Sequence, residues 1–231
     1  MMTRSPRITF PLVAVNFKTY SESLGEAAVK LAKIAEDVSL KTGVCIAVAP
    51  QLVDLSRIVT NVKIPILAQH VDPYDSGPYT GHSSIDAVKQ AGATGSIINH
   101  SEHMLKLSDI DQIIRKMRRL ELTSIVCTNT PQVSAAVAAL EPDIIAIEPP
   151  ELIGTGIPVS KSKPEIVTDT ISLIKRINTG VRVLCGAGIT KGEDAAAAIE
   201  LGTLGVLVSS GVVKAQDPSR ALTDLAEAVR K

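Results

Sequence analysis

The sequence predicts a single-domain α/β protein, a (β/α)8 barrel that spans residues 1–231. Eight short apolar runs recur along the chain, and most of the gaps between them carry a helix signal. The runs are almost continuously hydrophobic, which is typical of parallel strands buried on both faces. The length of 231 residues fits one such barrel. A doubly wound open sheet is the alternative, but it usually has a glycine fingerprint after its first strand, where this chain has Val15-Asn16-Phe17-Lys18.

The elements follow in order from the apolar runs and from the start and stop signals around them. Capping-box patterns at Ser23–Glu26 and Thr190–Glu193 predict two helix starts. Residues 71–81 hold too much Pro, Gly and Asp for a helix and predict a long protruding loop. The expected strands are Leu12–Phe17, Val44–Ala49, Ile64–Gln69, Ser96–Asn99, Ser124–Cys127, Ile144–Ile147, Val181–Cys185 and Gly205–Val208. The expected helices are Ala27–Leu40, Ser108–Leu120, Pro131–Leu140, Pro164–Ile177, an alanine-rich helix that ends near Gly202, and Pro218–Val229.

Composition narrows the class of protein. Hydrophobic residues make up 45% of the chain, which suits a sizeable core, and 24 basic residues balance 24 acidic ones. This balance, with no Trp, argues against a nucleic-acid or membrane partner. Cys45, Cys127 and Cys185 lie in apolar runs without a C-x-x-C pair, so we expect reduced thiols in a cytoplasmic protein. No run approaches the ~20 apolar residues of a membrane span.

Polar residues stand at the predicted carboxyl ends of the strands, where active sites of such barrels lie. Small-residue turns after strands seven and eight would let backbone N–H groups approach a phosphate. No metal-ligand cluster stands out, so we expect neither a metal nor a cofactor. The strand-end residues are Asn16 and Lys18, His100 and Glu102, Glu148, Gly186-Ala187-Gly188, and Ser209-Ser210-Gly211.

A carboxylate, an imidazole and an ammonium beside a phosphate site fit proton transfer next to a carbonyl group. Glu148 would take a proton from carbon, His100 would polarise the oxygen, and Lys18 would stabilise the developing negative charge. A double proline and a loop with two glycines follow Glu148, which suits a lid. Plainer interpretations stay open at this point: a surface glutamate, a satisfied strand-end histidine and a solvated lysine.

Together, these motifs resemble those of the triosephosphate isomerase family, whose fold is the TIM barrel. The resemblance implies an aldose–ketose isomerase that interconverts dihydroxyacetone phosphate and D-glyceraldehyde 3-phosphate in glycolysis and gluconeogenesis, without a cofactor. The alternative is a phosphate-binding barrel that acts on, or merely binds, another sugar phosphate. The matching motifs run in order along the chain: Asn16-Phe17-Lys18, Gln69, Tyr79-Thr80-Gly81, His100-Ser101-Glu102, and Glu148-Pro149 with Ile153-Gly154-Thr155-Gly156.

The resemblance also implies a role for each matching residue. Glu148 would be the base, His100 the electrophile and Lys18 the third catalytic group, with Glu102 as a supporting residue. The substrate contacts would come from Asn16, Phe17 and Lys18, and from backbone groups of Ile153, Gly188, Ser209 and Ser210 that hold the phosphate.

Departures from the family pattern point to one branch of it. Abbreviated helices around Thr130–Glu141 resemble the compact archaeal branch, in which tetramers occur alongside dimers. Apolar groups on the 71–81 loop are expected to enter a neighbouring subunit of a homodimer or homotetramer, unless the loop folds back on its own barrel. The other departures replace residues that are usual in the family. Pro150-Glu151 stands at the lid hinge, Ser209-Ser210 replaces a pair of glycines, and Gly188 lies where a serine is commonly found. His103-Met104 replaces two arginines, and His82 replaces an acidic residue.

Overall fold

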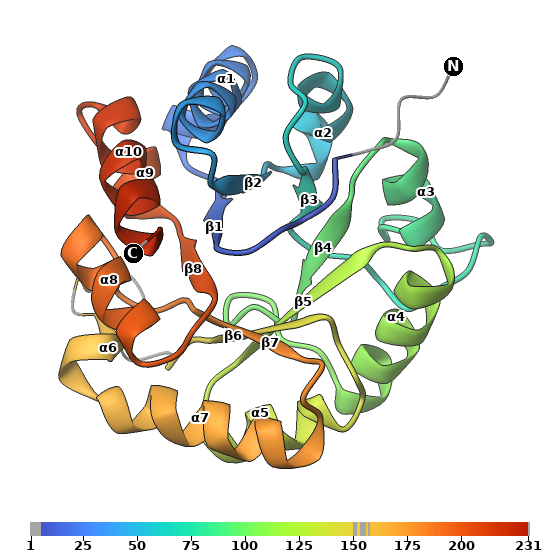
Figure 1. The fold of residues 1–231 in the computed structure, drawn as a ribbon. Coiled ribbons are helices and arrows are strands. Elements are labelled where there is room, and N and C mark those ends of the chain that lie inside the picture. The colour runs from blue at the N-terminus through green and yellow to red at the C-terminus, as the bar shows by residue number, and fades with distance from the viewer. Residues whose placement is uncertain (1–5, 150–151, 153–155, 157, 231) are drawn as a thin grey trace.

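The computed structural model, which describes residues 6–149, 152, 156 and 158–230, contains one sheet of eight parallel strands. Their order is β2-β1-β8-β7-β6-β5-β4-β3. The two edges meet at a parallel bridge between Val48 and Ile66, where the Val48 amide donates to the Pro65 carbonyl at 3.1 Å. The sheet therefore closes into the predicted barrel (Figure 1). The strands are β1 Leu12–Asn16, β2 Cys45–Ala49, β3 Leu67–Ala68, β4 Gly95–Ile98, β5 Thr123–Thr128, β6 Ile144–Ile147, β7 Arg182–Cys185 and β8 Gly205–Val208.

Helices surround the barrel and cover the outer face of its strands (Figure 1). After β6, the short helix α6 precedes α7, and after β8, the short helix α9 precedes α10. A 3-10 turn, η1, follows β1. The helical elements are η1 Ser21–Ser23, α1 Glu26–Thr42, α2 Leu52–Val59, α3 Ile85–Gln90, α4 Leu107–Arg119, α5 Pro131–Ala138, α6 Val159–Ser162, α7 Pro164–Ile177, α8 Gly192–Glu200, α9 Ser210–Val213 and α10 Pro218–Val229.

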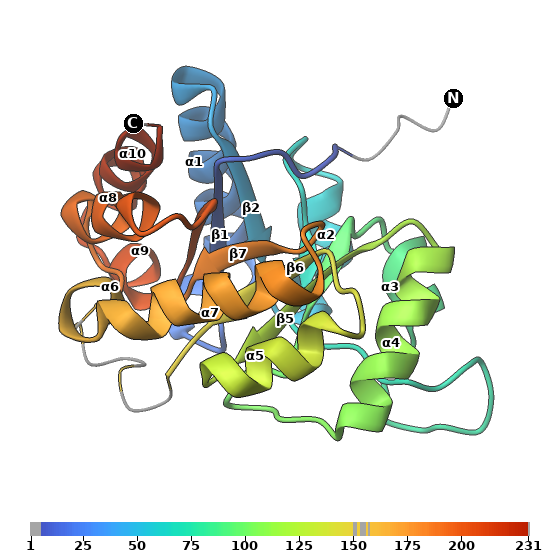
Figure 2. The ribbon, with the colours of Figure 1, turned by 60° about the horizontal axis from the view of Figure 1, so that its bottom comes forward.

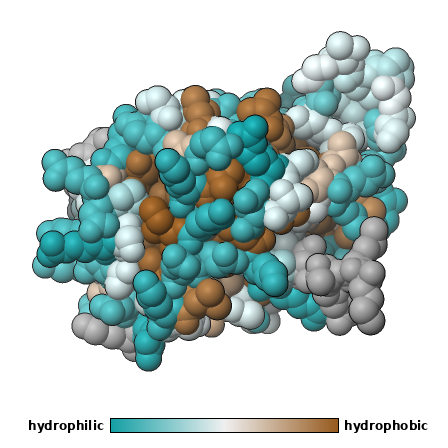
Figure 3. Space-filling model, turned by 90° about the horizontal axis from the view of Figure 1, so that it is seen from above, coloured by the Kyte–Doolittle hydropathy of each residue, from teal (hydrophilic) through white to brown (hydrophobic). Residues whose placement is uncertain are grey.

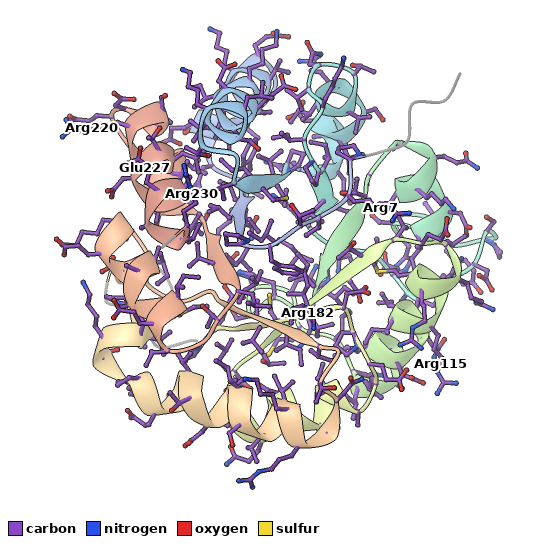
Figure 4. The ribbon with its side chains drawn as sticks, viewed as in Figure 1. Arg7, Arg115, Arg182, Arg220, Glu227 and Arg230 are labelled. Carbon is purple, nitrogen blue, oxygen red and sulfur yellow. The ribbon has the colours of Figure 1, made fainter. Side chains whose placement is uncertain are left out.

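The core has two layers because successive residues of a strand point to opposite faces. In β1, Leu12 and Ala14 belong to an inner cluster, whereas Val13 and Val15 belong to the outer cluster between strands and helices. Side chains fill the inside of the ring of strands (Figure 4). The barrel is therefore a packed core that supports a site at one end.

The third strand is shorter than the predicted Ile64–Gln69. Pro65 has no N–H to donate to a neighbouring strand. Gln69 lies beyond the end of β3, and its side-chain amide donates to the backbone carbonyls of Ala49 and Lys18, at 2.9 and 3.0 Å. Between Pro65 and Gln69, the strand is therefore reduced to Leu67–Ala68.

The predicted capping box at Ser23–Glu26 does not form. Ser23 lies in η1, and its hydroxyl donates to the Phe17 carbonyl at 2.8 Å. Gly25, with φ of 54°, precedes α1 instead, and its amide donates to Asp54 at 2.8 Å. At α8 the capping carboxylate is that of Asp194, which accepts from the Lys191 amide at 3.3 Å, and not that of Glu193.

The loop predicted after the third strand projects beyond α3 and α4 (Figure 2). Tyr74 and Tyr79 stack on it with ring centroids 4.4 Å apart, and both are partly exposed. Lys116 on α4 ties the loop down through an ion pair to Asp75 at 2.6 Å, and it also pairs with Asp86 on α3 at 2.5 Å.

The outer surface is mixed in character. From above, hydrophobic residues show between hydrophilic ones (Figure 3), and Leu40 on α1 and Val53 on α2 are largely exposed. Arg115 on α4 and Arg220 on α10 lie at the periphery (Figure 4). None of the helices in the described part of the chain has both the length and the apolar character needed to cross a lipid bilayer.

Candidate active site

A pocket of about 480 Å³, open solvent included, lies at the carboxyl ends of the strands. It brings together residues that are far apart in the sequence, as a parallel barrel predicts. Among the described residues, no group of three or more His, Cys, Asp and Glu side chains is arranged to hold a metal ion. The pocket is lined by Asn16, Lys18, Tyr20, His100, Glu148, Gly156, Gly186, Gly188, Ile189, Thr190, Leu207, Val208, Ser209 and Ser210.

Lys18 is held in a conformation that a non-glycine residue rarely adopts. Its φ is 48°, and such a residue persists only where neighbours fix it, at a cost of about 1–3 kcal/mol. Its amide donates to Asn16 Oδ1 at 3.0 Å, and its carbonyl accepts from Gln69 Nε2 at 3.0 Å. Its ammonium Nζ lies 2.7 Å from the carboxylate of the half-exposed Glu102. The turn after β1 therefore fixes one cation at the mouth of the pocket.

His100 presents a neutral imidazole to the pocket. The Glu102 amide donates to His100 Nδ1 at 3.2 Å, so Nδ1 is the acceptor and the ring proton resides on Nε2. Burial lowers the pKa of His100, the Lys18 charge lowers it further, and the Glu102 charge opposes them. Nε2 lies 3.8 Å from Glu148 Oε1, and the ring is buried. His100 can therefore donate a hydrogen bond to an oxygen placed in the pocket.

Glu148 is a buried carboxylate at the end of β6, with 4% of its surface exposed. Its Oε2 has no hydrogen-bond partner among the described residues. Burial raises the pKa of Glu148 to about 7, although a hydrogen bond from the Cys127 thiol and the Lys18 charge lower it. Because that pKa lies near neutrality, Glu148 can both accept and return a proton.

Gly186 makes the room that Glu148 occupies. A Cβ atom at this position would lie 2.4 Å from Glu148 Cγ and 2.9 Å from Oε1. The Gly186 amide donates to the Ile147 carbonyl at 3.0 Å, which holds the end of β7 against β6. A side chain at position 186 would thus displace the carboxylate.

The small-residue turns after β7 and β8 form another wall. Gly188 has φ of 73°, which favours glycine, whereas Ser209 has φ of −144° and Ser210 starts α9. Neither serine has a left-handed backbone conformation, so glycine is not required at these two positions. Gly211 does need to be small, because a Cβ there would lie 2.9 Å from the Thr190 Cα.

The structure brings most of the predicted residues together. Asn16, Lys18, His100, Glu148, Gly188, Ser209 and Ser210 line the pocket, and Glu102 contacts both Lys18 and His100. Phe17 stands apart: it is fully buried in the outer core cluster and does not line the pocket. Ile153 lies outside the described residues, as do the lid positions 150, 151, 154 and 155.

Sequence reasoning missed some neighbours of the site. Tyr20 lines the pocket, with Lys214 Nζ 4.1 Å from the centre of its ring. The buried Cys127, at the end of β5, contacts Glu148, and burial raises the pKa of its thiol. Cys127 is the next-to-last residue of β5 and Tyr20 lies four residues beyond β1, so nearness to strand ends was the available signal. The contacts themselves join segments that no local pattern connects.

Comparisons with known proteins agree with this geometry. The sequence model of the triosephosphate isomerase family matches residues 11–229. The triosephosphate isomerase of Methanothermus fervidus is 55% identical over 215 residues, which are 93% of this chain and 97% of the relative. That of Methanocaldococcus jannaschii is 55% identical over 214 residues, 93% and 98% of the two chains. That of Methanothermobacter thermautotrophicus is 51% identical over 219 residues, which are 95% of this chain and 96% of the relative.

These relatives come from methanogenic archaea, which confirms the predicted resemblance to the archaeal branch. The matched segment reaches from the residue before β1 to the end of α10, so it includes the whole barrel and every described residue of the pocket. The chain belongs to the triosephosphate isomerase family.

Proposed function

We propose that the chain interconverts dihydroxyacetone phosphate and D-glyceraldehyde 3-phosphate, with Glu148 as the base that moves the proton. The observation that supports this most is the pairing of a buried carboxylate, with a pKa of about 7, and a neutral imidazole whose Nε2 is 3.8 Å away. A base and a hydrogen-bond donor at this spacing suit a substrate in which a C–H bond lies next to a carbonyl group.

In the proposed reaction, ionised Glu148 removes a proton from C1 of dihydroxyacetone phosphate, and the electron pair of that C–H bond forms the enediolate. His100 Nε2–H donates a hydrogen bond to the carbonyl oxygen, where negative charge develops, and Lys18 supplies a nearby positive charge. Protonated Glu148 then returns its proton to C2. The hydroxyl proton of the C1 oxygen moves to the C2 oxygen, which balances the conversion.

The phosphate of the substrate would bind at the turns after β7 and β8. Backbone N–H groups of Gly188, Ser209 and Ser210 are the proposed donors there, with Ile153 from the lid. Asn16 would hold Lys18 in its strained conformation, and Glu102 would orient Lys18 and His100. We assign no substrate role to the Phe17 side chain and propose that this residue acts through its place in the turn.

A barrel that only binds a sugar phosphate is a weaker explanation. Keeping the Glu148 carboxylate buried, with no hydrogen-bond partner for Oε2 among the described residues, works against the charged form, as its raised pKa shows. A binding protein gains nothing from a base that is difficult to ionise and aimed at a neutral imidazole. An enzyme that must take and return one proton does gain from it.

We also propose that residues 1–231 act as one domain in a cytoplasmic homodimer or homotetramer. The exposed, stacked Tyr74 and Tyr79 on a loop that Lys116 anchors would be covered by a second copy of the chain. The three free cysteines, of which Cys127 and Cys185 are buried, are compatible with a reducing compartment.

A coupled isomerase assay with both triose phosphates tests the proposal. Wild-type protein should convert each into the other. Glu148→Gln should lower kcat by about 10²–10⁴-fold, because a positioned general base contributes that much. Glu148→Asp, which withdraws the carboxylate by about 1 Å, should lower it by roughly a hundredfold.

The matched control is Glu200→Gln on the exposed end of α8, which should leave turnover unchanged. Turnover of Glu148→Gln at the wild-type rate would show that another group is the base. No conversion of either triose phosphate by well-folded wild-type protein would reject the function itself.

A further inference from the structure

Asn99, the residue before His100, has a backbone conformation that few residues other than glycine adopt. Its φ is 59°, in the left-handed region. Asparagine enters that region more readily than most residues, but glycine does so without a steric cost. Glycine would therefore serve this backbone at least as well, so the backbone alone does not explain an asparagine here.

The side-chain amide of Asn99 uses both of its polar atoms. Its Oδ1 accepts a hydrogen bond from the Leu105 amide at 2.9 Å, which closes residues 99–105 into a loop. Its Nδ2 donates to the Cys127 carbonyl at 2.9 Å, so it joins the end of β4 to the end of β5. One side chain thus shapes the loop that contains His100 and also attaches that loop to the neighbouring strand.

The end of β5 also holds the proposed base. Cys127 and Thr128 are the last two residues of this strand. The Thr128 carbonyl accepts from the Glu148 amide at 2.7 Å, just as the Cys127 carbonyl accepts from the Asn99 side chain. Two successive carbonyls of one strand therefore hold the two segments that carry His100 and Glu148.

We infer that Asn99 is a positioning residue that holds His100 at its working distance from Glu148. The inference rests on the proposed function, in which His100 Nε2 and Glu148 Oε1, 3.8 Å apart, act on one substrate. Asn99 does not line the pocket, so it acts through His100 and does not touch the substrate. Because a hydrogen-bond donor must already be in place where charge develops, a shift of about 1 Å can lower the rate roughly a hundredfold.

The test compares two substitutions of Asn99 with a matched control. Asn99→Gly removes both side-chain bonds and suits the left-handed backbone, whereas Asn99→Asp keeps an acceptor for the Leu105 amide but has no N–H for the Cys127 carbonyl. The control is Glu121→Gly, since Glu121 is exposed and also has a positive φ, 55°, but lies between α4 and the start of β5, at the other end of the barrel.

Both Asn99 variants should lower kcat about 10-fold to 100-fold with a smaller change in KM, because His100 acts mainly on charge that develops in the transition state. Nitrogen NMR of histidine-labelled protein reads the imidazole directly, and the His100 signals are those that His100→Gln lacks. Wild-type protein should show the Nε2–H tautomer, and the Asn99 variants a mixture of both tautomers. Glu121→Gly should keep the wild-type kcat and the wild-type His100 signals.

A merely structural role would change Tm but neither kcat nor the His100 signals. Wild-type kcat and unchanged His100 signals in either folded Asn99 variant, whatever its Tm, would overturn the inference and leave the proposed function standing. If Asn99→Gly does not fold, Asn99→Asp, which keeps the loop closed, decides the question. If the wild type does not isomerise triose phosphates, the proposed function fails, and altered His100 signals in the Asn99 variants would still support the positioning of the imidazole.

Discussion

Replacing Gly186 by alanine should slow the reaction through Glu148 alone. The added Cβ would lie 2.4 Å from Glu148 Cγ, whereas ordinary contact begins at 3.4 Å, so the side chain must move by 3.4 − 2.4, or about 1 Å. The Gly186 backbone is held by its hydrogen bond to Ile147, so the carboxylate is the group that yields. Misplacement of a reacting group by about 1 Å can lower the rate roughly a hundredfold.

The expected result is a kcat about a hundredfold below wild type with a much smaller change in KM. Gly186 lies in the turn after β7, but the three atoms nearest to its added Cβ all belong to Glu148, and the proposed phosphate donors Gly188, Ser209 and Ser210 are kept. Initial rates in the coupled assay, over a range of triose phosphate concentrations, separate the two constants. Circular dichroism and thermal unfolding check that the variant is folded.

The matched control is Gly180→Ala, which lies before the other end of β7. There the added Cβ would meet only the flexible Asn178 side chain, with Oδ1 3.1 Å away. It should keep wild-type kcat. A folded Gly186→Ala protein whose kcat is within twofold of wild type would refute the position, or the role, that we assign to Glu148.

Other expectations concern pH, substrate and assembly. The base must be ionised, and burial raises its pKa to about 7, so kcat/KM should fall about tenfold per pH unit below pH 7. A flat pH profile down to pH 5 would argue against Glu148 as the base. Glyceraldehyde, which lacks the phosphate, should lose kcat as well as affinity in the same assay. Light scattering over a dilution series should show at least a dimer at micromolar concentration, and Lys116→Met should weaken it by releasing Asp75; a fully active single chain would contradict an obligate oligomer.

The fold could be predicted because its signals are local. Strands buried on both faces are continuous apolar runs, so β6 and β8 have the predicted bounds. Parallel topology then places all the carboxyl ends together, which is why Lys18, His100 and Glu148 could be assigned to one site before any distance was known.

What the sequence could not predict depends on contacts between distant segments. The Gln69 side chain donates to the carbonyls of Ala49, at the end of β2, and of Lys18, in the turn after β1. Ser23 donates to the Phe17 carbonyl and does not cap a helix. The need for glycine at Gly186 exists only because Glu148 lies against it. Short helices such as α2 and α3 also escaped prediction, since a few residues give little periodicity to recognise.

Burial of Glu148 gives the site its near-neutral base, but it lowers the free energy of unfolding at high pH. Its pKa is 4.5 in an ordinary environment and about 7 here, so between these pH values the folded state holds a proton that the unfolded chain has lost. The resulting stabilisation is complete below about pH 4.5 and is lost as pH rises through 7, which amounts to about 3 kcal/mol. Glu148→Gln stays neutral at every pH and avoids that loss.

The variant that abolishes the base should therefore be more stable than wild type at pH 8, by up to about 3 kcal/mol, and the difference should shrink to about 1 kcal/mol at pH 5. Urea unfolding of both proteins at the two pH values measures this, with the exposed Glu200→Gln as the control that should show no such difference. Equal stability of Glu148→Gln and wild type at pH 8 would mean that the carboxylate is solvated in the folded protein. In that case the dry environment on which its role as a near-neutral base depends would not exist in solution.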